Sequence, residues 1–160
     1  NLILPRMRNV NAGRIIYISS VLGFVAMPFR GPYVASKFAI EGLIGTLRLE
    51  FSDTNIKFSS IQPGPIESKF RENAYLAFKK NVDISNSHYQ DQYKIMIKRL
   101  QSGKNVKFTL PPEAVLKNAI HALESSNPKN YYRVTFPTKL FALLGNILPS
   151  RWMDYILNKS

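Results

Sequence analysis

The chain contains no cysteine, which excludes disulfides and thiolate metal sites. It has only two histidines, His88 and His121, and neither has a partner at a spacing typical of metal ligation or catalysis, so we expect both to be structural or solvated. No apolar run is long enough to span a bilayer, and no internal repeat or low-complexity tract is present. The missing cysteines fit a reducing compartment, and we expect a cytoplasmic protein.

Acidic residues are scarce: ten Asp and Glu stand against 22 Lys and Arg, a net charge of +12 over 160 residues. Half of this excess lies between Lys69 and Lys107, where nine basic residues face three acidic ones. We interpret the stretch as a solvated surface lobe. An anionic ligand, an acidic lipid surface or nucleic acid is the alternative that this charge leaves open.

The chain begins with Asn1 rather than Met, and the residues up to Met7 look like the end of a helix that has no start. We interpret the sequence as part of a domain. Its length suffices for one domain and not for two.

A strand, a helix and a second strand follow one another with short connections. Residues 14–20 are β-branched and almost all apolar, typical of a parallel strand buried on both faces. Apolar residues at helical spacing predict a helix over about 31–52, and residues 56–62 predict the second strand, which ends at Pro63-Gly64-Pro65. This pattern indicates a right-handed βαβ unit, and hence an α/β, Rossmann-like, doubly wound parallel sheet with three αβα layers.

The second half predicts a lobe and a helical tail. Residues 66–109 indicate irregular helices rich in aromatic and basic side chains, and Pro111-Pro112 opens a helix through about Leu123. A short strand is expected over 131–136, followed by two amphipathic helices around Pro149 within 137–158. The lobe aromatics suit core packing and a lipophilic pocket equally well, and the terminal helices either pack on the domain or lie on a membrane surface.

Three polar residues stand out for chemistry. Ser20 ends the first strand, and Tyr33 and Lys37 are four residues apart on the helix, so their side chains share one face. A phenol titrates near ~10, and a neighbouring cation favours its phenolate, which suits general acid–base catalysis. Because ligands of open α/β sheets bind beyond the carboxyl ends of the strands, these residues and the Pro63-Gly64 turn should converge on one crevice.

The combination of Ser19-Ser20-x-x-Gly23, Tyr33-x-x-x-Lys37 and Pro63-Gly64-Pro65-Ile66-Glu67-Ser68 closely resembles the C-terminal half of the short-chain dehydrogenase/reductases. The specific match runs over residues 14–70 and continues more loosely to the end. The segments around Tyr33 and the tail resemble the retinol- and hydroxysteroid-dehydrogenase branch and its bacterial relatives.

This resemblance implies a role for each matched residue. Tyr33 would be the general acid in carbonyl reduction and the base in alcohol oxidation, Lys37 would favour its deprotonated form, and Ser20 would hydrogen-bond the carbonyl oxygen. Contacts to the nicotinamide half of the cofactor would come from a larger set: Tyr33, Lys37, Pro63, Gly64, Ile66 and Ser68. Ser68 replaces the usual threonine. NADP(H) is favoured, with NAD(H) as the alternative, and no metal is implied.

Two family features are missing from these residues: the glycine-rich turn that cradles the pyrophosphate, and the additional active-site asparagine. We therefore expect the 160 residues to be the C-terminal part of one NAD(P)-binding domain, with a substrate lobe at about 66–109, and to bind cofactor weakly and be inactive alone.

The expected function is reduction of an aldehyde or ketone, or the reverse oxidation, on a hydrophobic small molecule. The resemblance also implies a homo-oligomer, formed through the helix that carries Tyr33 and the helix before it, with Phe38 and Leu47 facing outward. No nucleic acid is expected, while peripheral membrane contact stays open. The alternatives are a non-enzymatic basic module that binds nucleic acid or acidic membranes, and a truncated, inactive relative.

Overall fold

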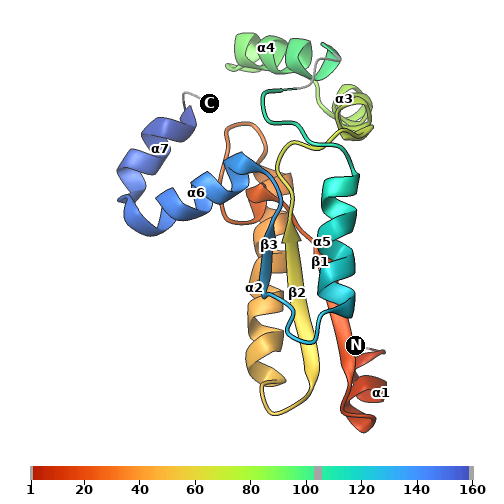
Figure 1. The fold of residues 1–160 in the computed structure, drawn as a ribbon. Helices are drawn as coiled ribbons and strands as arrows, with labels where there is room; N and C mark the ends of the chain where they lie inside the picture. Colours follow the sequence, from red (N-terminus) through yellow and green to blue (C-terminus); the bar gives the residue numbers. More distant parts are fainter. Residues whose placement is uncertain (1, 103–105, 159–160) are drawn as a thin grey trace.

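A parallel sheet of three strands forms the centre of the protein (Figure 1). The computed structural model describes residues 2–102 and 106–158. Within them β1 (Gly13–Ile18), β2 (Ile56–Gln62) and β3 (Tyr131–Arg133) lie in the order β1-β2-β3. Gly13 pairs with Ile56 and Ile18 with Ile61, so the carboxyl ends of β1 and β2 reach the same edge of the sheet. Strand β3 pairs with β2 in parallel, starting at Ser60 and Tyr131.

Helices cover both faces of this sheet. The long helix α2 (Gly31–Glu50) buries Ile44 and Leu47 against Ile56 and Phe58 of β2. On the other face lies α5 (Glu113–Glu124), whose Ala122 belongs to a second core cluster. The other buried members of this cluster are Ile61, Tyr132 and Val134. Successive residues of a strand point to opposite faces, so β2 contributes to both clusters. The three-layer, Rossmann-like α/β fold expected from the sequence is confirmed.

Strands β1 and β2 differ in burial. Six of the seven residues of β2 are buried, as expected for a parallel strand covered on both faces. In β1 none is buried, and Ile18 is 51% exposed. The expectation that this strand is buried on both faces is therefore wrong for the part of the chain described, because β1 has a strand neighbour on one side only.

The lobe and the tail lie at the carboxyl-terminal end of the sheet (Figure 1). The lobe contains α3 (Phe70–Asn81) and α4 (Gln90–Gln101), two regular helices where irregular ones were expected. Residues 103–105 of the predicted lobe lie outside the described residues. Strand β3 is shorter than predicted, because helix α6 (Phe136–Ile147) already begins at Phe136.

The predicted pair of terminal helices around Pro149 is present as α6 and α7 (Ser150–Asn158). Each has one packed face and one exposed face. Ala142 and Leu157 are buried, whereas Ile147 and Trp152 are each 66% exposed. The tail thus packs in part on the domain, and no helix in the described ranges is long and apolar enough to cross a membrane.

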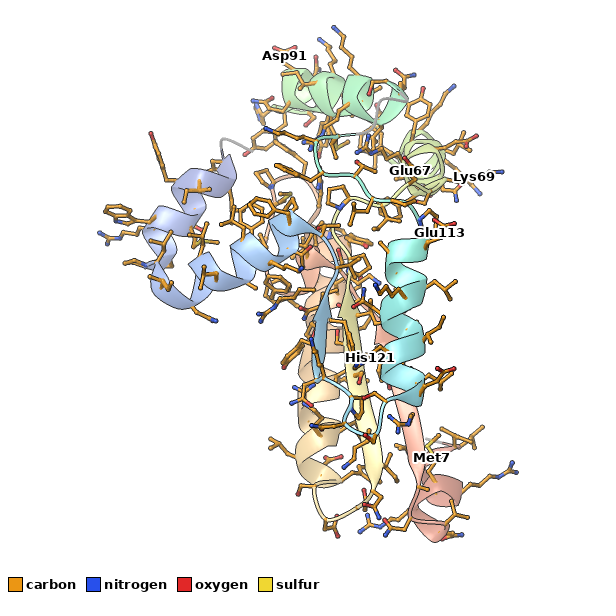
Figure 2. All side chains as sticks on the ribbon, viewed as in Figure 1. Met7, Glu67, Lys69, Asp91, Glu113 and His121 are labelled. Carbon is orange, nitrogen blue, oxygen red and sulfur yellow. The ribbon has the colours of Figure 1, made fainter. Side chains whose placement is uncertain are left out.

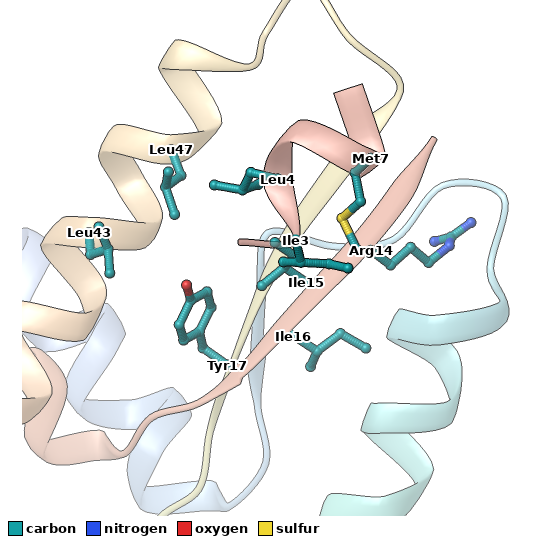
Figure 3. Close-up of a pocket in the computed structure, with 9 residues that line it drawn as sticks. All are labelled: Ile3, Leu4, Met7, Arg14, Ile15, Ile16, Tyr17, Leu43 and Leu47. Carbon is teal, nitrogen blue, oxygen red and sulfur yellow. The ribbon is translucent and has the colours of Figure 1, made fainter. Parts of the chain in front are cut away.

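An apolar pocket lies beside β1, where α1 (Leu4–Asn9), β1 and α2 meet (Figure 3). Met7, Ile15, Tyr17 and Leu43 line it. The predicted site residues do not, so this hollow is separate from the candidate active site.

The expectation that Leu47 faces outward is wrong. This side chain is only 8% exposed, because it packs in the core under α2. Phe38 is 44% exposed, as an outward position requires.

Candidate active site

Tyr33 and Lys37 lie together beside the end of β1. Both are on the first turns of α2, and the Lys37 Nζ lies 5.7 Å from the centre of the Tyr33 ring. Lys37 Nζ also donates a hydrogen bond to the Ile18 carbonyl oxygen, at 3.1 Å. An ammonium has three donors, so this bond fixes the lysine next to the tyrosine and leaves two N–H groups for other acceptors.

Ser20 starts the short 3₁₀ helix η1 (Val21–Gly23) that follows β1. Its Oγ accepts a hydrogen bond from the Leu22 N–H, at 3.1 Å, the usual arrangement of a serine at a helix start. Because this bond uses a lone pair, the Ser20 hydroxyl hydrogen stays available to donate. The backbone N–H of Val21 donates to the Pro63 carbonyl oxygen at 2.8 Å, which ties the serine segment to the turn after β2.

The neighbouring Ser19 has a different environment. It is 4% exposed, and its Oγ is buried without a hydrogen-bond partner. A Cβ added to Gly23 would come within 2.7 Å of that Oγ, so Gly23 gives the serine its space. Ser19 and Ser20 therefore point into different surroundings although they are adjacent in sequence.

The Pro63-Gly64 turn is pressed against the start of α6. A Cβ on Gly64 would lie 2.1 Å from the Thr135 Oγ1 and 2.7 Å from the Thr138 Oγ1, distances that no real side chain tolerates. Both threonines are fully buried and hydrogen-bond each other at 2.9 Å. Sequence reasoning missed them; a polar Thr-x-x-Thr pair at the end of the predicted strand was the available signal.

Ile66 and Ser68 follow this turn. Ile66 forms a parallel bridge with Leu110, whose two hydrogen bonds use the N–H groups of Glu67 and Leu110. The Ile66 N–H stays outside the bridge. The Ser68 Oγ accepts from the Phe70 N–H at 3.3 Å and is exposed, so it helps to start α3.

Aromatic contacts join the lobe to the Tyr33 region. The rings of Tyr33 and Phe70 are 5.4 Å apart, and Phe29, just before α2, makes edge contacts with Tyr89 at 5.6 Å and Tyr93 at 5.4 Å. Phe78 of α3 contacts the same Tyr93 at 5.5 Å. Phe70 is nevertheless 54% exposed, so its ring both touches Tyr33 and presents apolar surface.

Positive charge gathers at the same place. Burial lowers the pKa of the Arg30 guanidinium, and the charges of Arg99 and Arg71 lower it further, while Tyr33 acts in the opposite direction. Arg30 is the residue before α2, Arg71 belongs to α3 and Arg99 to α4. Three arginines from three separate elements thus interact near Tyr33, a feature that the sequence did not reveal.

Two further polar groups lie away from this crevice. His121 belongs to α5 (Figure 2), and its Nδ1 forms a 2.9 Å hydrogen bond with the hydroxyl of Tyr132 in β3. This contact supports the expected structural role. His88 is exposed. No group of three or more potential metal ligands occurs among the residues described.

The family model described as short chain dehydrogenase matches residues 1–77, which include Ser20, Tyr33, Lys37 and the Pro63-Gly64 turn. The chain belongs to the short-chain dehydrogenase family.

Curated relatives match nearly the whole chain. The uncharacterized oxidoreductase YbbO of Escherichia coli K12 is 38% identical over 97% of this chain and 52% of its own length. The 3-ketodihydrosphingosine reductase of Bacteroides thetaiotaomicron is 31% identical over 97% of this chain and 56% of its own length. Human retinol dehydrogenase 8 is 31% identical over 79% of this chain and 41% of its own length. The chain therefore spans about half the length of these relatives.

Solved structures agree on the fold. A short-chain dehydrogenase from Burkholderia cenocepacia in complex with NADP has a TM-score of 0.64 and 18% identity, covering 96% of this chain and 50% of that one. One from Burkholderia phymatum in complex with NAD has a TM-score of 0.64 and 23% identity, covering 89% and 50%. At these identities the likeness concerns the fold, and it includes proteins that bind either nicotinamide cofactor.

Proposed function

We propose that the protein is an NAD(P)-dependent oxidoreductase that reduces an aldehyde or ketone, or oxidises the corresponding alcohol. The observation that carries this proposal is the position of Lys37, which bonds the Ile18 carbonyl at the end of β1 and lies against the Tyr33 ring. Family membership and the names of the oxidoreductase relatives support the same reaction class.

In this proposal Tyr33, Ser20 and Lys37 each have a separate role in proton transfer to the carbonyl oxygen. When a carbonyl is reduced, negative charge develops on its oxygen, and donors placed there stabilise the transition state. Tyr33 gives its hydroxyl proton to that oxygen, and Ser20 donates a hydrogen bond to it. Lys37 stabilises the tyrosine oxygen after the proton has left, because a cation favours the phenolate. In alcohol oxidation Tyr33 takes the proton instead.

The residues described fit the nicotinamide half of the cofactor. Lys37 has two unused N–H groups that suit ribose hydroxyls, and the Ile66 N–H next to the Pro63-Gly64 turn suits a carboxamide oxygen. Ser68 would add a further contact. The cofactor supplies the hydride when it is bound. NADP(H) is proposed ahead of NAD(H) on the branch resemblance alone.

The chain is further proposed to be the C-terminal part of a Rossmann-like domain. In the described part β1 has a partner on one edge only, and the apolar pocket of Figure 3 lies beside it. A further strand and helix there would cover both. The tyrosine-bearing helix α2, with Phe38 exposed, is proposed to take part in self-association. Localisation stays a prediction.

The test is Tyr33→Phe in the protein at its full natural length, assayed by carbonyl-dependent NADPH oxidation. We expect turnover to fall by about 10² to 10⁴-fold, the usual contribution of a general acid–base group. Tyr131→Phe is the control. Tyr131 is the first residue of β3, and its hydroxyl contacts Arg48 of α2 rather than a residue of the crevice. Retention of more than a few per cent of turnover in Tyr33→Phe would remove this residue from the acid–base role.

A hydrophobic substrate is proposed as well. Phe70 presents an exposed ring that touches Tyr33, and the lobe adds further aromatic surface nearby. Lipophilic substrates are also named for two of the relatives, a ketodihydrosphingosine and a retinol. The rival idea of a basic module that binds nucleic acid or an acidic membrane rests on the net charge and the basic stretch from Lys69 to Lys107, and the relatives described above do not favour it.

A further inference from the structure

Arg30 is a partly buried cation without an acidic partner. Its Nη1 lies 3.2 Å from the Met27 sulfur, a weak acceptor. In residues 2–102 and 106–158 no carboxylate forms an ion pair with it. The remaining positions of the chain contain no Asp or Glu, so they supply no carboxylate side chain either. A guanidinium in this position lacks the partner that burial of a charge requires.

The position of Arg30 is fixed from both sides. Phe29 before it is held under α4 by Tyr89 and Tyr93, and Tyr33 after it contacts Phe70 at the start of α3. Arg30 is three residues from Tyr33, about one helical turn. The cation and the proposed acid–base hydroxyl are therefore close enough to contact one small molecule.

The local electrostatics favour an anion. Arg71 and Arg99 reach this place from α3 and α4, and both lower the pKa of Arg30, as does its burial. The acid carried by α4, Asp91, already pairs with Lys94 at 3.0 Å. An oxyanion bound beside Arg30 would give this guanidinium the acidic partner that it lacks. The planar guanidinium is suited to bind a carboxylate or phosphate through two parallel hydrogen bonds.

We propose that Arg30 binds an anionic group of the substrate and so selects carbonyl compounds that carry a carboxylate, sulfonate or phosphate. This inference rests on the proposed function. The exposed Phe70 ring and its aromatic neighbours contact the apolar body of the same molecule, and the anionic end, held by Arg30, places the carbonyl at Tyr33. The substrate is then a hydrophobic acid rather than a neutral lipid.

The test compares a matched pair of aldehydes in the protein at its full natural length. The probes are 4-formylbenzoate, which carries a carboxylate, and its neutral methyl ester. We expect wild type to prefer the acid, and Arg30→Gln to lower kcat/KM for the acid by about 10- to 100-fold, as expected for loss of a charge-assisted hydrogen bond. The ester should change by less than about threefold, and Arg30→Lys should recover part of the loss.

Lys80→Gln is the matched control. Lys80 is exposed on α3, nine residues from Arg71 and hence on the opposite face of the helix. Like Arg30→Gln, the Lys80→Gln substitution removes one positive charge, but at a position outside the crevice. Both aldehydes should therefore react as in wild type. Equal losses for acid and ester in Arg30→Gln, or no preference for the acid in wild type, would overturn the inference. A raised KM for NADPH with an unchanged KM for the acid would assign Arg30 to the cofactor instead.

A binding measurement separates this inference from the proposed reaction. Isothermal titration calorimetry with 4-methylbenzoate and 4-methylbenzamide needs no turnover. Binding of the acid that is lost in Arg30→Gln supports the anion site even if neither aldehyde is reduced, an outcome that would count against the proposed oxidoreductase. Equal binding of acid and amide would overturn the anion site even if both aldehydes were reduced.

Discussion

Gly64 shows how much one missing side chain matters here. The residue lies in the turn after β2, against two fully buried threonines, Thr135 and Thr138. The same turn receives the Val21 N–H through Pro63, so its shape also holds the segment that begins with Ser20. Stability and the proposed site therefore depend on the same close approach.

Gly64→Ala is expected to destabilise the protein by about 1 to 3 kcal/mol, the usual cost of forcing an extra methyl group into a packed site. The added Cβ would lie 2.1 Å from the Thr135 Oγ1, so the start of α6 has to move. Urea denaturation followed by circular dichroism measures the change.

The control for this substitution is Gly42→Ala. Gly42 is in the middle of α2, and nothing lies within 4 Å of the position that an alanine methyl group would take, so alanine should stabilise the helix by about 0.5 to 1 kcal/mol. The close-packing account fails if Gly64→Ala has no effect or stabilises the protein.

Adjacent serines give a second test at this scale. Ser20→Ala removes the proposed donor to the carbonyl oxygen and should lower kcat by about 10² to 10³-fold. Ser19→Ala removes a buried hydroxyl that has no hydrogen-bond partner, so turnover should stay within about threefold. Steady-state kinetics of both variants with one aldehyde decides; similar losses in the two would contradict the assignment of Ser20.

At the scale of elements, α2 and β2 are joined by a polar contact inside the fold. The Ser60 hydroxyl donates to Glu41 Oε1 at 2.6 Å, and the second carboxyl oxygen, Oε2, is buried without a partner. Ser60 itself is fully buried. The Ser60 hydroxyl is therefore the hydrogen-bond donor that compensates the burial of the Glu41 carboxylate.

Ser60→Ala should therefore lower the free energy of unfolding by about 1 to 3 kcal/mol, because it leaves a carboxylate oxygen without its donor. Ser36→Ala, which removes an exposed hydroxyl bonded to its own helix, should cost less than about 0.5 kcal/mol. Chemical denaturation of both variants provides the comparison. If the two cost the same, the Ser60–Glu41 contact does not link α2 to β2.

The elements also show what sequence patterns can predict. The bounds of β2 and the start of α2 follow from β-branched runs, helical spacing and a proline–glycine stop, which are local signals. Strand β3 ends three residues earlier than its sequence pattern predicts. Val134, Thr135 and Phe136 also favour a strand, whereas in the structure Thr135 packs against Gly64 and α6 already begins at Phe136.

At the level of the whole molecule, the affinity for the cofactor depends on both halves of the cofactor site. The described residues offer contacts for the nicotinamide half, and the sequence contains no glycine-rich turn for the pyrophosphate. We expect these 160 residues alone to bind NADPH at least about 100-fold more weakly than the protein at its full natural length, a difference near 2.7 kcal/mol. Fluorescence titration of NADPH measures both affinities, and equal values would contradict the proposed division of the site.

The sequence by itself determined the family, the α/β class and the candidate residues Ser20, Tyr33 and Lys37, because those features depend on short spacings within and between consecutive strands and helices. Tertiary structure alone decided which contacts form between distant segments. It buried Leu47, brought Gly64 against Thr135, and drew Arg30 together with Arg71 and Arg99. Local sequence patterns do not predict these contacts, since each contact depends on how two or more elements pack together.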